Sequence, residues 1–121
     1  MKRLGLVAHD DKKRELIEWI DGHRSKLQDQ ELFATGTTGK MIGDRFPELH
    51  PHCFRSGPHG GDQQLGAAIA EGRLDALIFF IDPLSPQPHD VDIKALLRLA
   101  ILYDIPFACN RASANCILRF M

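Results

Sequence analysis

Short runs of hydrophobic residues alternate with helical patterns along the chain. The runs have the length of β-strands and occupy residues 4–8, 31–34, 53–55, 76–81 and 106–108. Strands that alternate with helical segments are typical of βαβ units, in which consecutive strands are parallel. The run at 76–81, ALIFFI, contains no polar residue, as expected for a strand that helices cover on both faces. The pattern therefore predicts an α/β fold with residues 76–81 at the centre of a parallel sheet.

Helices are predicted between these strands. The clearest pattern has hydrophobic residues at i, i+3, i+4, i+7 and i+8, namely Ile93, Leu96, Leu97, Ala100 and Ile101. We expect Asp90 to cap this helix and Asp104 to mark its end. A shorter stripe at 16–20 predicts a first helix, and weaker patterns predict helices at about 40–45 and 62–71.

The composition limits the size and the partners of the protein. The chain has 121 residues, of which 44% are hydrophobic and 26% are charged, and this suits a single domain over residues 1–121. Its 15 basic and 16 acidic residues give a net charge of −1, so no overall field attracts nucleic acid or an anionic membrane. The longest apolar run is far shorter than the roughly 20 residues that span a bilayer. We expect a cytoplasmic protein that binds neither nucleic acid nor membrane.

The cysteines and histidines do not form the pattern of a metal site. Cys53, Cys109 and Cys116 are odd in number and lack CxxC spacing, so we expect reduced thiols, mostly in the core. His50 and His52 form a His-x-His pair, but no third ligand follows at a useful spacing. The sequence therefore predicts no metal.

Polar loops follow the first four predicted strands. In an open parallel sheet, ligands bind outside the carboxyl ends of the strands, near helix N-termini whose free N–H groups attract anions. These loops are residues 8–13, 35–39, 56–64 and 82–90. We expect all four to lie on one edge of the sheet.

Two of these loops are suited to bind a phosphate. Residues 35–39, TGTTG, combine hydroxyl groups with glycines at a strand-to-helix junction, although an ordinary turn with a threonine cap explains them equally well. No Gly-Lys-Ser/Thr follows, so a nucleotide triphosphate is not implied. Lys13 lies with His9 and Asp10 at the first strand-to-helix turn. Its ammonium group can bind a phosphate as a point charge, although lysines in such turns are usually just solvated.

The other two loops carry candidate acids and bases. Asp62 follows two glycines and can abstract a proton, but an acidic residue in the first turn of a helix also suits the helix dipole. His89 follows a proline-rich segment, and a neutral imidazole can polarise a carbonyl group or shuttle protons. Asp90 and Asp92 fit either the same site or the start of the next helix.

Together, these motifs resemble those of the methylglyoxal synthases in order and spacing. The matching segments are VAHD at 7–10, ATGTTG at 34–39, SGP at 56–58, GGDQQ at 60–64, PHD at 88–90, Asp92, and KALLR at 94–98. The resemblance extends over about residues 4–115, and the combination of GGDQQ, PHD and ATGTTG is highly specific.

The resemblance implies a fold and an activity. The fold is a three-layer, doubly wound α/β sandwich with a five-stranded parallel sheet, assembled as a homohexamer. The activity is that of a carbon–oxygen lyase, which converts dihydroxyacetone phosphate to methylglyoxal and inorganic phosphate. The reaction proceeds by proton abstraction, an enediol intermediate and phosphate elimination, without a cofactor or metal. Inorganic phosphate is then both a product and an inhibitor.

The resemblance also implies roles for individual residues. Asp62 is the catalytic base, His89 acts on the carbonyl and enediol oxygens, and Asp92 and Asp10 are supporting carboxylates. The substrate-binding residues are His9, Lys13, Thr35, Gly36, Thr37, Thr38, Ser56 and Gly57. His59 departs from the family pattern, which often has an apolar residue such as methionine at this position. It places a titratable ring beside the catalytic loop.

Two other functions compete with this hypothesis. The same fold serves as a non-catalytic regulatory module that binds phosphate ligands. Such a module can keep the threonines and lose the acids, so the presence of Asp62, His89 and Asp92 favours the enzyme. A metal-storage or metal-sensing protein built on the six histidines predicts stoichiometric bound metal.

Overall fold

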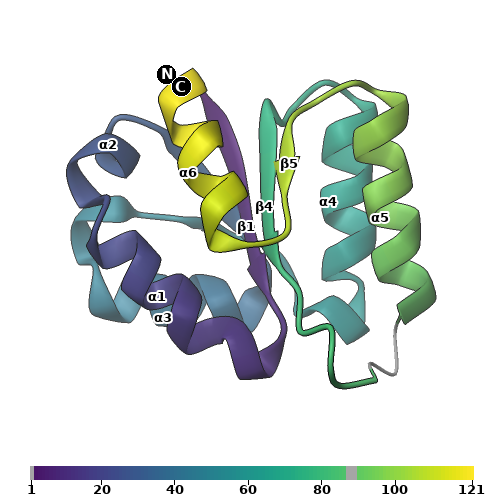
Figure 1. Ribbon diagram of the computed structural model, residues 1–121, viewed down its shortest axis with the longest axis horizontal. Coiled ribbons are helices and arrows are strands. Elements are labelled where there is room, and N and C mark those ends of the chain that lie inside the picture. The colour runs from purple at the N-terminus through teal and green to yellow at the C-terminus, as the bar shows by residue number, and fades with distance from the viewer. Residues whose placement is uncertain (1, 87–89) are drawn as a thin grey trace.

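A parallel sheet of five strands organises the chain (Figure 1). The computed structural model describes residues 2–86 and 90–121. The strands are β1 (Arg3–Ala8), β2 (Glu31–Ala34), β3 (His52–Cys53), β4 (Ala76–Phe80) and β5 (Phe107–Ala108). Their order is β3-β2-β1-β4-β5, and every neighbouring pair is parallel. The chain fills one side of β1 and then the other, so the topological switch point lies between β1 and β4.

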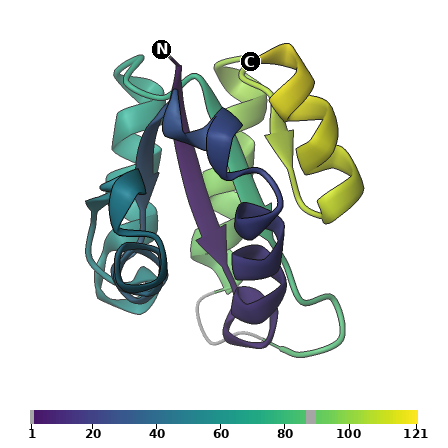
Figure 2. The ribbon, with the colours of Figure 1, turned by 90° about the vertical axis from the view of Figure 1, so that its left-hand side faces the viewer.

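Helices cover both faces of this sheet (Figures 1 and 2). They are α1 (Lys13–Asp21), α2 (Arg24–Gln28), α3 (Gly36–Arg45), α4 (Gly61–Ala70), α5 (Asp90–Leu102) and α6 (Arg111–Phe120), with 3-10 turns η1 (Asp10–Lys12), η2 (Pro47–Leu49) and η3 (Gly57–His59). The helices α1, α2, α3 and α6 pack against one face, and α4 and α5 pack against the other. The predicted three-layer, doubly wound α/β fold is confirmed.

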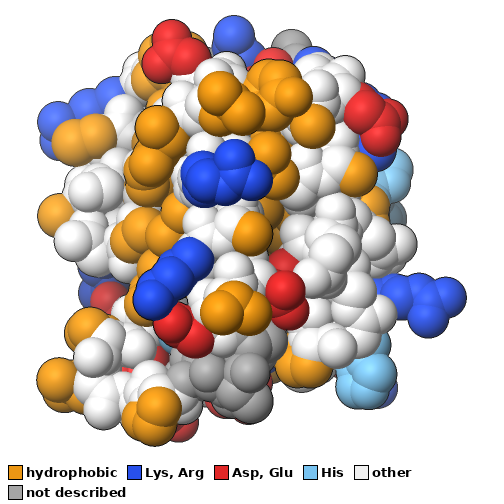
Figure 3. Space-filling view, turned by 90° about the vertical axis from the view of Figure 1, so that its right-hand side faces the viewer, with side chains coloured by type: hydrophobic (Ala, Val, Ile, Leu, Met, Phe, Trp, Pro, Cys, Tyr) orange, Lys and Arg blue, Asp and Glu red, His pale blue; other side chains and the backbone are white. Residues whose placement is uncertain are grey.

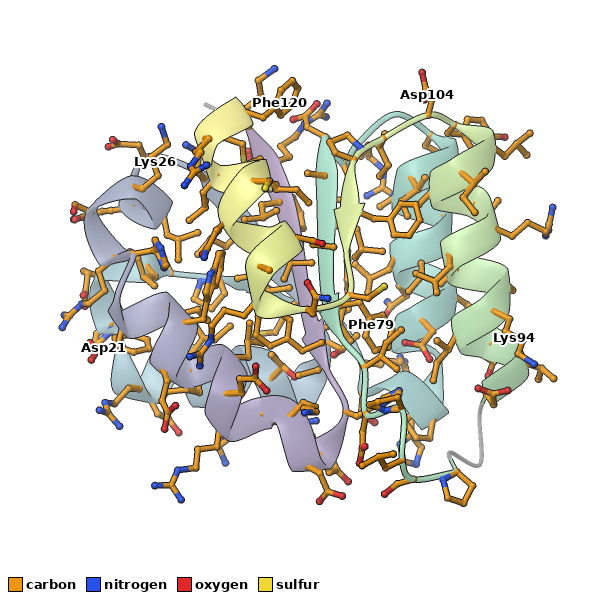
Figure 4. The ribbon with its side chains drawn as sticks, viewed as in Figure 1. Asp21, Lys26, Phe79, Lys94, Asp104 and Phe120 are labelled. Carbon is orange, nitrogen blue, oxygen red and sulfur yellow. The ribbon has the colours of Figure 1, made fainter. Side chains whose placement is uncertain are left out.

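The middle strand is β1, so the prediction that residues 76–81 form the centre of the sheet is wrong by one strand. The side chains of β1 and of its neighbour β4 alternate between two hydrophobic clusters. Leu4 and Leu6 of β1 join the cluster with α1, α3 and α6, whereas Val7 joins the cluster with α4 and α5. In β4, Phe80 belongs to the first cluster and Phe79 to the second, and Figure 4 shows Phe79 on the side of the sheet that faces α4. Every residue of β4 is buried. The side chains on both faces of this strand are buried away from water, which explains its uniformly apolar sequence.

Most predicted elements agree with the structure to within one or two residues, and the predicted amphipathic helix is α5. Asp90, predicted as its cap, is the first residue of α5. Asp104 lies just after the helix in the left-handed region, with φ of 56°, a conformation that Asp tolerates better than most residues. The helix predicted at 40–45 begins earlier, at Gly36, and the helices α2 and α6 were not predicted.

The prediction that the cysteines lie mostly in the core is wrong. Cys53 and Cys116 are exposed, Cys109 is half-buried, and all three are free thiols. Cys53 belongs to β3, an edge strand that has a neighbour on one side only. Cys116 lies on α6 beside the buried Ile117 but faces solvent. Burial raises the pKa of the Cys109 thiol, which favours its protonated form.

Candidate active site

A cleft opens at the carboxyl edge of the sheet. The ribbon in Figure 2 shows the strand-to-helix connections gathered at this edge, at the bottom of the view. It lies over the ends of β1 and β4, which contribute Ala8 and Phe79, and so it occupies the switch point. The space between its lining residues is about 490 Å³ when the open mouth is included. Most of the residues predicted for the site line the cleft: His9, Asp10, Lys13, Thr35, Thr37, Ser56, Gly57 and Asp62.

Lys13 is held at the end of β1 by two acceptors. Its Nζ donates to the carbonyl oxygen of Ala8 at 2.8 Å and to Asp10 Oδ1 at 3.0 Å. The side chain of Lys13 is only 15% exposed, whereas that of Asp10 is 96% exposed. An ammonium group has three N–H donors, so these two bonds leave one donor for a ligand in the cleft.

Residues 35–39, which we call the threonine loop, form the start of α3, and no threonine side chain caps this helix in the ordinary way. Thr35 occupies the N-cap position, but its side chain makes no capping hydrogen bond. The first N–H groups of a helix have no acceptor within it, and the helix dipole favours an anion there. Thr37 is exposed in the cleft, whereas Thr38 is 1% exposed and its Oγ1 has no hydrogen-bond partner among the described residues. The Thr37 side chain is therefore available to an anionic ligand, whereas the buried Thr38 Oγ1 lies behind the residues that line the cleft.

The loop around Ser56 packs closely against the threonine loop and against the start of α4. The Gly36 N–H donates to the carbonyl oxygen of Arg55 at 3.0 Å, and a Cβ on Gly36 would lie 2.9 Å from the Ser56 nitrogen. A Cβ on Gly61 would overlap the carbonyl oxygen of Arg55. Only glycine fits at these two positions, because the obstructing atoms belong to the backbone. The two glycines thus let the threonine loop, the loop around Ser56 and the start of α4 pack closely together.

Asp62 is a buried carboxylate in the first turn of α4. It is 3% exposed and lines both the main cleft and a groove between α4 and α5. Asp92, in the first turn of α5, lines the same groove but not the main cleft. An acidic residue that only suited the helix dipole would gain nothing from burial, because removing a charge from water costs free energy. The burial of Asp62 therefore favours a functional role.

His9 lies beside Phe79, with its ring 5.3 Å from the phenyl ring in an edge-on arrangement. It is 5% exposed, and its Nδ1 accepts a hydrogen bond from the Asp82 N–H at 2.9 Å. A ring nitrogen that accepts carries no hydrogen, so we assign the neutral tautomer with hydrogen on Nε2. His9 can therefore donate from Nε2.

Asp82 is a candidate site residue that the sequence reasoning missed. Its Oδ1 accepts a hydrogen bond from the Leu84 N–H at 3.0 Å. That bond and one from the Ser85 side chain lower the pKa of the Asp82 carboxyl group. Asp82 also lines a second cavity beside His9, together with Asp90 and Lys94. Its position directly after the most buried strand was a signal in the sequence that could have identified it.

Comparisons with known proteins agree with this geometry. The family model for MGS-like domains matches residues 15–109. The methylglyoxal synthase of Leptospira interrogans is 56% identical over 115 residues, which are 95% of this chain and 77% of that protein. The methylglyoxal synthase of Brucella ovis is 55% identical over 117 residues, 97% of this chain and 94% of that protein. The crystal structure of methylglyoxal synthase from Elizabethkingia anophelis matches with a TM-score of 0.91 at 48% identity, covering 97% of this chain and 76% of that one.

The chain belongs to the methylglyoxal synthase family. It is therefore an enzyme of the lyase class.

Some of the site residues that the family resemblance implied do not line the cleft. Gly36 and Thr38 lie in the threonine loop but behind the residues that line the cleft, and Asp92 lies in the adjoining groove. His89 lies outside the described residues, so its role stays a prediction. His59 contacts Ser56 from outside the cleft.

Within 2–86 and 90–121, no three His, Cys, Asp or Glu side chains are grouped so that they could hold a metal ion. In the same part of the chain, no helix is both long and apolar enough to cross a membrane.

Proposed function

We propose that the chain converts dihydroxyacetone phosphate to methylglyoxal and inorganic phosphate. The observation that carries this proposal is the cleft at the switch point, where donors suited to a phosphate and a buried carboxylate share one space. Lys13 and Ser56 provide N–H and O–H donors, and Asp62 provides a base. A small phosphate ester with a carbonyl group matches this combination.

The phosphate group binds to the donors of the first three loops. The third N–H of Lys13, the first turn of α3 and the Ser56 hydroxyl all serve the same cleft. A helix N-terminus and an ammonium group together neutralise much of the charge of a phosphate. The chain's own groups are sufficient for this task, so we propose that the reaction uses neither a metal nor a cofactor.

Asp62 removes a proton from the carbon next to the substrate carbonyl. Such a proton is far less acidic than a carboxylic acid, so the site must stabilise the negative charge that develops on oxygen. His9 contributes a donor through Nε2, since its Nδ1 is occupied by the Asp82 N–H. The family resemblance adds His89 at the carbonyl and enediol oxygens, with Asp92 and Asp10 as supporting carboxylates.

Phosphate leaves after the enediol has formed. The bridging C–O bond breaks readily when it stands perpendicular to the enediol plane, because it then overlaps the π system. The donors around the phosphate hold this angle, and an in-plane phosphate would be retained. Positioning by the binding loops thus selects elimination over isomerisation.

We also propose that residues 1–121 form one domain, that the protein is cytoplasmic and that it assembles as a homohexamer. Exposed hydrophobic side chains support self-association. On α5, Val91, Ile101 and Leu102 are 75%, 66% and 63% exposed, and Figure 3 shows hydrophobic groups spread over the face that α4 and α5 form. Contact with another subunit would remove this area from water.

The proposal is tested by incubating the purified protein with dihydroxyacetone phosphate and excess chelator. We expect methylglyoxal and inorganic phosphate in equal amounts, and competitive inhibition by added phosphate because it occupies the same donors. A folded protein that binds phosphate but forms no methylglyoxal would instead support the regulatory phosphate-binding module.

A further inference from the structure

His59 contacts the candidate phosphate-binding loop through Ser56. Ser56 Oγ and His59 Nδ1 lie 2.7 Å apart, which is the distance of a well-formed hydrogen bond. The backbone fixes the pair, because the Ser56 carbonyl oxygen accepts from the N–H groups of His59 at 3.0 Å and Gly61 at 2.9 Å. Ser56 lines the cleft, whereas His59 is exposed and lies outside its lining. The ring therefore acts on the cleft through the serine hydroxyl.

The direction of this hydrogen bond decides what Ser56 presents to a ligand. A hydroxyl group has a single hydrogen. If His59 Nδ1 carries no hydrogen, the Ser56 hydroxyl donates to it and shows only lone pairs to the cleft. If Nδ1 carries hydrogen, the ring donates to Ser56 Oγ and the O–H is available to the ligand. The oxygens of a phosphate dianion can only accept, so the second arrangement is the one that binds phosphate.

We propose that His59 is a positioning residue that directs the Ser56 hydroxyl hydrogen toward the phosphate group of the substrate when Nδ1 is protonated. This inference rests on the proposed function, because it takes a phosphate ester as the ligand of Ser56. An imidazolium ring carries hydrogen on both nitrogens. Phosphate binding is therefore linked to protonation of His59. Neutral His59 reaches the same arrangement only as the Nδ1–H tautomer.

Charged groups of both signs lie near the pair. Among the described residues, Asp62 of α4 and His9, Asp10 and Lys13 at the connection between β1 and α1 line the cleft with Ser56, and the Arg55 side chain lies near Gly60. Carboxylates favour the imidazolium form, and the cationic side chains oppose it. A bound phosphate dianion adds negative charge beside Ser56, so the ligand itself favours the protonated ring.

The test measures the affinity of the full-length protein for inorganic phosphate by calorimetry, from about pH 5 to pH 8, where histidine titrates. His59→Leu removes the ring nitrogen. His59→Asn keeps an amide N–H near the position of Nδ1 but does not titrate. Phosphate itself titrates in the same range, so each affinity is divided by that of His59→Leu at the same pH.

We expect the wild-type ratio to be about threefold to tenfold at the acidic end, the value of one added hydrogen bond. This ratio should fall to one or below at the basic end, because a neutral ring that accepts from Ser56 keeps the hydroxyl hydrogen from the ligand, whereas the His59→Asn ratio should stay constant. In turnover, His59→Leu should raise KM and leave kcat nearly unchanged, because Ser56 binds substrate and transition state alike. In a Ser56→Ala background, His59→Leu should have no further effect.

Three results would overturn the inference: a wild-type ratio near one at every pH, a ratio that does not change with pH, or an effect of His59→Leu that persists without the Ser56 hydroxyl. If the wild type makes methylglyoxal and binds phosphate, any of these overturns the role of His59 alone. A folded wild type that neither binds phosphate nor makes methylglyoxal overturns the proposed function as well. His59 is exposed, so its variants are expected to fold.

Discussion

The amino and carboxyl edges of the sheet differ in how fully their polar groups are hydrogen-bonded within the protein. At the amino edge, polar groups pair with one another: the Arg3 N–H and guanidinium group donate to Asp75 at 2.7 and 3.3 Å, and the Lys2 N–H donates to Gln30 at 2.9 Å. At the carboxyl edge, Lys13 keeps a donor for the cleft, and the buried Thr38 Oγ1 has no hydrogen-bond partner in the described chain. Satisfied groups stabilise a fold, whereas unsatisfied buried groups cost stability.

From this difference we expect the amino edge to contribute mainly to stability and the carboxyl edge mainly to function. Changes at the amino edge should lower the free energy of unfolding without changing the reaction. Changes at the carboxyl edge should alter kcat or KM by far more than they alter stability, unless they disturb the close contact between the loops.

The largest effect is expected for Asp62→Asn, which keeps the shape of the side chain and removes its basicity. We predict that kcat falls by about 10²–10⁴, the range for losing a general base. Asp44→Asn, at an exposed position of α3, is the matched control and should leave kcat unchanged. Steady-state formation of methylglyoxal measures both. An Asp62→Asn enzyme with the wild-type kcat would exclude Asp62 as the base.

The next effect concerns Lys13 and its neighbour. Lys13→Met removes the ammonium group from the cleft, and we predict a rise in KM of about tenfold to a hundredfold, as for a hydrogen bond to a charged group. Lys12→Met is the control, because Lys12 pairs with Glu15 at 3.4 Å and does not line the cleft. Equal changes in KM for the two variants would contradict a specific role for Lys13.

Two glycines test how tightly the loops of the carboxyl edge are packed. Gly61→Ala places a methyl group on the carbonyl oxygen of Arg55, and we predict a loss of about 1–3 kcal/mol in the free energy of unfolding. Gly43→Ala, in α3, meets nothing within 4 Å and should add about 0.5–1 kcal/mol through helix propensity. Urea unfolding measures both changes. A stable Gly61→Ala protein would show that the loops can separate.

The smallest effect is expected at the amino edge. Burial opposes ionisation of Asp75, but hydrogen bonds from the Arg3 side chain and N–H outweigh it and lower the pKa of Asp75. A lowered pKa stabilises the fold above the unfolded value of about 3.9, and this contribution disappears as the pH falls through the folded value.

We predict that Asp75→Asn lowers the free energy of unfolding at neutral pH by about 0.5–1 kcal/mol, since the pair is partly exposed, and leaves kcat unchanged. The difference from wild type should shrink in acid below about pH 4. Urea unfolding at the two pH values measures it. A loss that is the same at both would assign the effect to packing rather than to charge.

The carboxyl edge could be predicted largely from sequence because its residues follow strand ends directly. Residues 76–81 identify an interior strand by their apolar side chains, although β1 is the middle strand. Parallel strands bring the following loops to one edge. The threonine loop and Asp62 could therefore be assigned to one site before any contact was known. The helix α3 begins at Gly36, earlier than predicted. Its first turn consists of the polar threonine loop, so a hydrophobic pattern could not indicate that this turn is helical.

Other features depend on contacts between distant residues. The Asp82 N–H reaches His9 across 73 positions of sequence, and no periodicity indicates such a bond. Cys53 reads as a core residue because its run looks like a strand, but only the strand order shows that β3 is at the edge. His59 and Ser56 are close in sequence, yet only the structure shows that Nδ1 faces Oγ.

The central claim is that the donors of the carboxyl edge bind phosphate and that Asp62 performs the chemistry. The most direct test measures methylglyoxal formation and phosphate affinity on the same preparations of wild type and Asp62→Asn, in chelator. We predict that the wild type forms methylglyoxal, and that Asp62→Asn binds phosphate at least as tightly but has lost turnover. A variant that turns over normally, or a folded wild type that forms no methylglyoxal, would contradict the account.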